Sequence, residues 1–358
     1  MRPDVIVAGA GPVGLATAIA AAREGLSVMV LERRATPDDK ACGEGILPPG
    51  VRALATLGVD GIDPESCTPI AGLRYVEEDG RFAEARLATP GLAARRPALV
   101  DAMARRARGL GVELRDGCAV RGFERREDAV AVDTDGGTLE AGILVAADGL
   151  HSPLRELAGL ARPGRGPRRF GLSQHFRVRP WSDFVEVHLA ACGEAYVTPV
   201  GPERVGVALL WEKNGGPPPG LDAFPRLAER LVGAEPDSAP RGAGPMAQRS
   251  SARVADRLVL VGDAAGYVDA ITGEGLSLGF SCALGLAPIL ARALQHGGSR
   301  AALAPYEPIF RREFRRYTLL TRGLLALARR PRTRRRVLRA LGRHPGAFER
   351  IVDWAVGA

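Results

Sequence analysis

The N-terminal segment constrains the fold more than any other part of the chain. It reads DVIVAGAGPVGLATAIAAAREGLSVMVLER. The apolar run 5–8 predicts a buried parallel strand, and Gly9, Gly11 and Gly14 follow with Gly-X-Gly-X-X-Gly spacing before a second apolar run that ends at Glu32. Such glycines permit a tight turn and close approach of a pyrophosphate, whose charge is favoured by the helix N-terminus. We therefore predict a dinucleotide-binding βαβ unit whose Glu32 binds ribose hydroxyls.

The same uncharged letters could also be interpreted as a signal peptide or a membrane span. Three glycines and a proline within ten residues favour a strand, a turn and a helix instead, so we expect no signal peptide and no transmembrane helix.

The five cysteines are odd in number and widely spaced, without metal-ligand spacing. This pattern favours a reducing, cytoplasmic location and predicts no metal site.

Two later stretches repeat the pattern of an apolar strand followed by glycine and aspartate. ILVAADGLHSPLR contains Asp148 after its strand, and RLVLVGDAAGYVDAITGEGLSLGFSCAL contains Asp263 before a glycine-rich turn and a helix of small residues. Together with the N-terminal motif, they resemble the glutathione-reductase-type flavoproteins. Within that class the resemblance is to the group of aromatic-ring hydroxylases, flavin halogenases and geranylgeranyl reductases. It covers residues 1–300, with the three motifs in the order of the family.

The resemblance implies FAD as the cofactor. Asp263 is expected to bind the ribityl chain, with Asp148 near the cofactor. The backbone at Gly273, Gly275 and Leu276 is expected to face the flavin, where a helix N-terminus favours the negative charge of the reduced ring. The remaining side chains implied at FAD are Glu32, Arg33 and Arg96, with Arg95 as a rival of Arg96.

These patterns predict an α/β chain with a Rossmann-type FAD-binding domain, a substrate domain built on an antiparallel sheet, and C-terminal helices. Residues 168–211 alternate in the manner of strands, and NGGPPPG at 214–220 predicts a solvated loop. The expected boundaries are 1–70, 95–165 and 250–300 for the FAD-binding domain, 71–94 and 166–249 for the substrate domain, and 301–358 for the basic helical region.

The basic charge is concentrated near the end of the chain. Residues 311–343 hold thirteen arginines and one acid, a local charge of +12, which leaves −4 for the rest of a chain whose net charge is +8. Apolar residues from Tyr306 onward recur at spacings of three and four, which predicts an amphipathic helix that Pro331 ends. We expect a helical cap with solvated arginines. The alternative is weak contact with a membrane surface, and nucleic-acid binding is not expected.

The resemblance leaves several chemistries open. The leading expectation, from the breadth of activity on this scaffold, is a monooxygenase that acts on an aromatic or polyketide-like small molecule through a C4a-hydroperoxyflavin. The alternative is a geranylgeranyl-reductase-like enzyme acting on a C=C bond. The stretches ACGEG at 41–45 and GDAAGYVDAITGEG resemble the corresponding motifs of that family. A halogenase is disfavoured because the three tryptophans are isolated. A non-catalytic flavoprotein remains a further alternative. The chain has one dinucleotide motif, which is assigned to FAD. We therefore expect NAD(P)H to bind only transiently when it reduces the flavin, or a separate reductase to deliver the electrons.

The loop DKACGEGILPPG at 39–50 is expected to run toward the flavin ring. Cys42 is a candidate proton donor or redox thiol if its pKa is lowered, and otherwise a small buried side chain. Glu44 could bind or protonate the substrate, or cap a helix or form a salt bridge. Candidates from elsewhere are Tyr196 and His175 on the second sheet, and Tyr267 and Asp269 beside the flavin-facing glycines.

Overall fold

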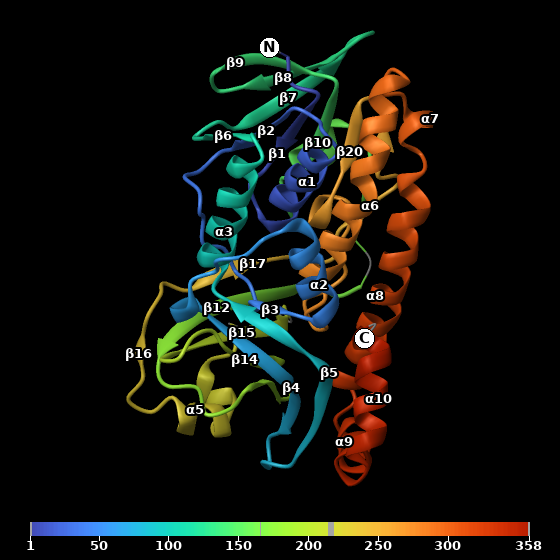
Figure 1. Ribbon diagram of the computed structural model, residues 1–358. Helices are drawn as coiled ribbons and strands as arrows, with labels where there is room; N and C mark the ends of the chain where they lie inside the picture. Colours follow the sequence, from blue (N-terminus) through green and yellow to red (C-terminus); the bar gives the residue numbers. More distant parts are fainter. Residues whose placement is uncertain (1, 165, 214–217, 357–358) are drawn as a thin grey trace.

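The computed structural model describes residues 2–164, 166–213 and 218–356. Figure 1 shows the two sheets at opposite ends of an elongated molecule, with the C-terminal helices along one side past both of them. Residues 214–217 of the predicted solvated loop lie outside the described residues. The architecture confirms the predicted α/β class with a second sheet and C-terminal helices.

The first sheet contains the dinucleotide motif. Its strand order is β19-β20-β10-β1-β2-β6, and all neighbours from β20 to β6 are parallel while β19 is antiparallel. Strands β1, β2 and β10 are buried throughout, as expected for a parallel sheet that is covered on both faces. The bounds are β1 Val5–Ala8, β2 Val28–Glu32, β6 Glu113–Asp116, β10 Ile143–Ala146, β19 Val254–Ala255 and β20 Leu258–Leu260.

Helices and a small sheet pack around these strands. Helix α1 (Pro12–Arg23) packs between α3 (Arg96–Gly109) and α6 (Gly275–Gln295), and α2 (Pro48–Leu57) packs against α6. Among the described residues, α6 is the one helix long and apolar enough to span a membrane, and 56% of its most apolar window is buried inside the protein. A three-stranded antiparallel sheet packs against β10; it consists of β7 Val120–Arg125, β8 Val130–Thr134 and β9 Gly137–Ala141.

The second sheet has nine strands in the order β16-β12-β15-β14-β13-β4-β5-β3, with β17 beside β12. The antiparallel pairing predicted for residues 168–211 is confirmed, and β13 in addition runs parallel to β4, which lies outside that range. The two strands are far apart in the chain, so the long connection that parallel pairing needs is present. The bounds are β3 Gly45–Ile46, β4 Cys67–Glu77, β5 Phe82–Ala94, β12 Arg169–Arg177, β13 Phe184–Leu189, β14 Glu194–Pro199, β15 Arg204–Glu212, β16 Glu235–Pro236 and β17 Arg241–Ala243.

The C-terminal helices cap both halves. Helix α8 (Tyr306–Ala328) packs against α6, whereas α9 (Pro331–Arg343) and α10 (Pro345–Val356) pack on β5. The cap is held by buried apolar side chains of α9 and α10 and by an ion pair between Arg334 and Glu77, both 3% exposed. The remaining elements are α4 Pro153–Leu157, α5 Pro225–Arg230, α7 Arg300–Leu303, β11 Ala161–Arg162, β18 Arg249–Ser250, and the 3₁₀ turns η1 Pro64–Ser66, η2 Leu221–Ala223 and η3 Gly262–Ala264.

Candidate active site

The glycine turn between β1 and α1 has no room for side chains. Gly9 has a φ of +112°, and a Cβ on it would collide with the carbonyl of Ala147 at the end of the neighbouring strand. A Cβ on Gly14 would collide with the carbonyl of Gly9. Gly11 is the N-cap of α1 and offers no side-chain cap, so the first N–H groups of the helix are available to an anion.

The predicted ribose-binding acid and arginine meet at a small pocket beside this turn. Glu32 is buried at the end of β2, where its Oε2 accepts a 2.9 Å hydrogen bond from Ala10 N. A Cβ on Gly11 would lie 3.5 Å from Arg96 Nη2, so the guanidinium faces the turn, whereas Arg33 is exposed. The pocket is lined by Ala10, Gly11, Glu32, Thr36, Asp38, Lys40, Arg96 and Val100.

Asp148 and Asp263 follow two adjacent strands of the first sheet. Asp148 Oδ2 accepts from Leu154 N at 3.1 Å, and the described structure offers no partner for its buried Oδ1. Burial raises the pKa of Asp148, and burial raises that of Asp263 to about 6 against the lowering effect of Arg96 and Arg155. Arg155 donates to the carbonyl of Ala264 at 3.1 Å, which holds the η3 turn against α4.

The segment before α6 carries the residues predicted to face the flavin. Gly273 is exposed with a φ of +67°, and Gly275 and Leu276 begin the helix after the N-cap Glu274. Burial raises the pKa of Glu274 to about 7, with Arg316 acting in the opposite direction. Glu274 Oε2 is buried and has no hydrogen-bond partner in the described structure. The N-terminus of α6 therefore presents backbone N–H groups beside a carboxyl that is partly neutral.

The residues present fit a bound FAD. The glycine turn has the space and the free N–H groups that a pyrophosphate needs, and Glu32 Oε1 accepts only one long 3.3 Å bond, from Arg34 N, within the described structure. Buried Arg96 Nε has no partner there either. We expect Glu32 to hold the ribose, Arg96 the phosphates, and Asp263 the ribityl chain. A bound flavin would supply hydride chemistry.

Cys42 lies beside Arg96 and Glu44, in the loop between β2 and β3. Burial raises the pKa of its thiol, and the adjacent Arg96 guanidinium lowers it less than burial raises it. The condition for a reactive thiolate, a lowered pKa, is therefore not met, and the thiol is protonated at neutral pH. Its Sγ accepts from Glu44 N at 3.3 Å, which fixes its direction.

Glu44 is held by neighbours rather than free to act on a substrate. Its Oε1 accepts from Arg96 N at 2.7 Å at the start of α3, and its Oε2 lies 2.7 Å from His175 Nε2. Arg95 hydrogen-bonds the same histidine, so the two adjacent arginines face different ways. The geometry favours the helix-capping and salt-bridge alternative for Glu44, in which the carboxylate joins the loop to both α3 and β12.

A buried ion triad joins the second sheet to the segment before α6. Arg169 on β12 donates through Nε to Asp269 Oδ2 at 2.9 Å and through Nη2 to Glu194 Oε2 at 2.6 Å. Burial raises the pKa of both carboxyls, and Arg169 opposes this. Asp269 was a candidate site residue from the sequence, whereas Arg169 and Glu194 were not predicted. Neither of them lies in a recognisable motif, and Arg169 is one of many arginines in the chain.

Three tyrosine hydroxyls surround the same segment. Tyr317 on α8 donates to the carbonyl of Asp269 at 2.5 Å and accepts from its N–H at 3.0 Å, and Tyr196 donates to the carbonyl of Ile271 at 2.8 Å. Tyr267 packs against Tyr317, and burial raises the pKa of all three hydroxyls. Tyr196 and Tyr267 therefore lie at the site, but Tyr196 positions the loop rather than reaching Cys42. The apolar stripe of α8 was visible in the sequence, but the polar contact of Tyr317 was not.

The fold and the site define an FAD-dependent oxidoreductase. Within the described residues, no group of three or more His, Cys, Asp or Glu side chains could hold a metal ion. A family profile described as FAD binding domain matches residues 2–217, and the chain belongs to this family.

Individual relatives extend over most of the chain. The chain is 30% identical to dialkyldecalin synthase of Streptomyces rugosporus, over 86% of this chain and 69% of that protein. It is 29% identical to digeranylgeranylglycerophospholipid reductase 1 of Methanopyrus kandleri, over 88% of each chain. Among solved structures, p-nitrophenol 4-monooxygenase of Pseudomonas putida superposes with a TM-score of 0.83 at 20% identity, over 99% of this chain and 97% of that chain, which shows a shared fold.

Proposed function

We propose that the protein reduces a carbon–carbon double bond of an apolar small molecule with FAD as its cofactor. The observation that carries the proposal is the position of the Cys42 thiol in the loop that enters the cofactor site, beside the Arg96 guanidinium, which is the group that lowers its pKa. Such a reduction adds a hydride to one carbon and a proton to the other, so it needs a proton donor and no base. Bound flavin would supply the hydride.

The other side chains at this place support the same proposal. Tyr267 also has a raised pKa and lies near enough to Cys42 for the thiol to influence it, so it too is protonated. The basic group nearby, His175, is engaged by Glu44 and Ser238. The similarity to a digeranylgeranylglycerophospholipid reductase over 88% of each chain supports an isoprenoid-like substrate.

Oxygen insertion into an aromatic or polyketide-like molecule, the leading expectation from the sequence, is the second candidate. Helix α8 and the three tyrosines pack over the segment before α6 and so exclude water from that side of the site. Exclusion of water favours oxygen insertion because it protects a reactive intermediate from hydrolysis. Halogenation gains no support, since Lys40 pairs with Asp38 and Lys213 stacks on Phe170.

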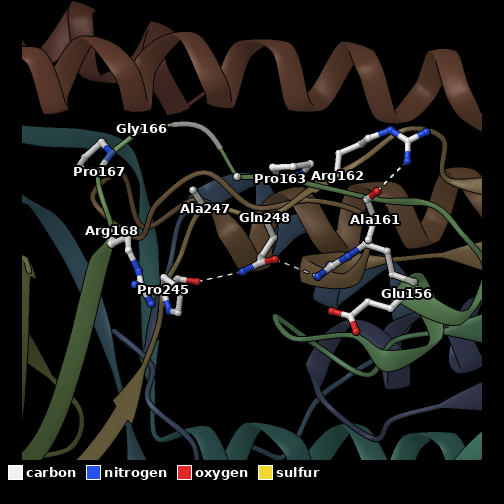
Figure 2. A pocket seen from close by; sticks show the side chains of 12 residues that line it. Glu156, Ala161, Arg162, Pro163, Gly166, Pro167, Arg168, Pro245, Ala247 and Gln248 are labelled. Atoms are coloured by element: carbon white, nitrogen blue, oxygen red, sulfur yellow. Dashed lines mark hydrogen bonds between the residues drawn. The ribbon is translucent and has the colours of Figure 1, made fainter.

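For the electron donor, we propose that NAD(P)H binds in a pocket beside α4 and β11. The pocket has a volume of about 440 Å³ and carries Arg155, Arg162 and Arg168 on its walls. Figure 2 shows Gln248 within it, bonded to the carbonyl of Pro245 on one side and to the guanidinium of Arg155 on the other. Arg155 is buried and bonded to the protein, so the exposed Arg162 and Arg168 are the two that suit the phosphates of a nicotinamide nucleotide.

The test is anaerobic turnover of a geranylgeranyl-bearing lipid by the FAD-loaded enzyme with NADH or NADPH. We expect a product heavier by two hydrogen atoms for each double bond. Cys42→Ala should lower the rate by about 10²-fold while FAD stays bound, and the matched variant of an exposed thiol, Cys192→Ala, should not. A product that gains an oxygen atom, formed only in air, would instead establish the second candidate.

A further inference from the structure

The outer surface of the C-terminal helices carries an ordered set of arginines. On α9, Arg332, Arg336, Arg339 and Arg343 follow one another at i, i+4, i+7 and i+11, which places them on a single stripe of the helix. All four are exposed. Stripes on the neighbouring helices are formed by Arg315, Leu319 and Arg322 of α8 and by Arg350, Ile351 and Trp354 of α10. We call these ten residues the outer helical face.

The arginines of the outer helical face differ from the others on the same helices. Arg334 forms a buried pair with Glu77 that anchors the cap, whereas Arg329 and Arg335 are exposed but pair with Glu212 and Glu78. Within residues 2–164, 166–213 and 218–356, no acidic partner is found for the seven arginines of the outer helical face. Like charges at i and i+4 repel one another. The arrangement therefore leaves a concentrated positive charge that the protein itself does not neutralise.

Large apolar side chains lie among these charges. Leu319 is 67% exposed, Ile351 is 52% exposed and Trp354 is 64% exposed. Trp354 is three residues after Ile351 and four after Arg350, so the three share one side of α10. Tryptophan and arginine together suit a lipid–water interface, because the ring enters the headgroup region while the guanidinium reaches the lipid phosphates.

The outer helical face is a preformed platform. The opposite side of α10 is buried through Phe348, Val352 and Val356 against the second sheet, and α8 packs on α6. Figure 1 shows the three helices together along one side of the molecule, with α9 and α10 beside β5. Contact through this side would need no refolding of the three helices.

We propose that the outer helical face docks on the surface of a bilayer that contains anionic lipids. Charge complementarity selects this occupant, since thirteen arginines and one acid occupy residues 311–343 of a chain whose remainder sums to −4. The exposed aliphatic side chains of Leu319 and Ile351 favour a lipid surface over a nucleic-acid duplex, whose phosphate backbone offers them no apolar partner. Binding combines a salt-sensitive part from the arginines with an apolar part from Ile351 and Trp354.

The test is sedimentation of the FAD-loaded full chain with vesicles of phosphatidylcholine alone or mixed with phosphatidylglycerol. We expect binding to the mixed vesicles only, weakened by salt. Changing the four arginines of the α9 stripe to glutamine should weaken partition by about a hundredfold or more, since each arginine near an anionic surface contributes about a factor of five. The matched control changes four exposed arginines of the body to glutamine, with no loss expected: Arg108, Arg125, Arg179 and Arg241.

Three results would overturn the proposal. The first is equal binding to both kinds of vesicle. The second is an equal loss in the body variant, which would assign the effect to net charge alone. The third is failure to sediment with any vesicle at low salt while the α9 stripe binds a DNA duplex. Unchanged thermal unfolding and FAD content in both quadruple variants show that the helices still pack, and Ile351→Ser with Trp354→Ser should remove the part of binding that persists in salt.

Discussion

Arg169 gives the sharpest test of how the two halves are joined. Replacing it by leucine leaves the carboxylates of Glu194 and Asp269 buried without their shared cation; the three side chains are between 1% and 5% exposed. Breaking a buried ion network by removing one partner costs about 3–5 kcal/mol. We expect the free energy of unfolding, measured by urea denaturation at pH 8, to fall by that amount in Arg169→Leu.

The pH dependence of this loss distinguishes the charge effect from lost packing. Burial raises the pKa of both carboxyls in the folded state, and removing Arg169 takes away the group that lowers it. A carboxyl whose folded pKa lies above its unfolded pKa stabilises the protein at low pH, and this stability is lost as the pH rises through the folded pKa. The deficit of the variant should therefore shrink between pH 8 and pH 5.

Two further variants complete the experiment. Arg169→Leu combined with Glu194→Gln should recover part of the loss, because only one buried carboxylate remains unpaired. Arg121→Leu removes an ion pair to Asp135 that is exposed on both sides, so no measurable change is expected. A loss below about 1 kcal/mol for Arg169→Leu, or one of constant size from pH 8 to pH 5, would refute the reasoning.

Three other predictions concern the cofactor site. Gly14→Ala should yield protein without FAD, seen as the absence of flavin absorbance after purification, because the new Cβ would collide with the carbonyl of Gly9. Tyr317→Phe should lower the free energy of unfolding by about 1–3 kcal/mol, since the polar groups of Asp269 lose their partner; an unchanged melting temperature would contradict this role. FAD affinity, followed by flavin fluorescence, should fall as the pH drops through about 6, where the Asp263 carboxylate is lost. An Asp263→Asn variant should bind more weakly with a flat pH profile, and a pH response identical to that of the parent would exclude Asp263 as its source.

Much of the fold was predictable because its signals are local. The turn at Gly9, Gly11 and Gly14 follows from spacing alone, since steric exclusion by nearby backbone acts on the residues that carry the motif. The helices after residue 300 follow from apolar spacing and from Pro331, which begins α9. The parallel pairing of β13 with β4 was missed, because strand direction depends on which distant segments meet and not on alternation within either one.

The site was less predictable because its contacts are distant in the chain. Arg169 and Asp269 are 100 residues apart, and Tyr317 meets Asp269 across 48 residues. Cys42 could be placed near the flavin from its loop, but its protonation depends on the burial and the neighbours that folding brings to it. A sequence pattern indicates which titratable side chains lie near the site. The pKa of each side chain depends on its burial and its neighbours in the folded protein.

The position of Tyr317 has a consequence for the order in which the protein is made. The glycine turn leaves the ribosome first, yet the segment around Asp269 is completed by a hydroxyl on α8, and β5 stays uncovered until α9 and α10 emerge. A nascent chain that has formed its first βαβ unit still lacks one wall of the flavin site and exposes apolar strand surface. Stable loading of FAD should therefore follow release of the chain, and nonsense truncation within α8 should yield an apoprotein prone to aggregation.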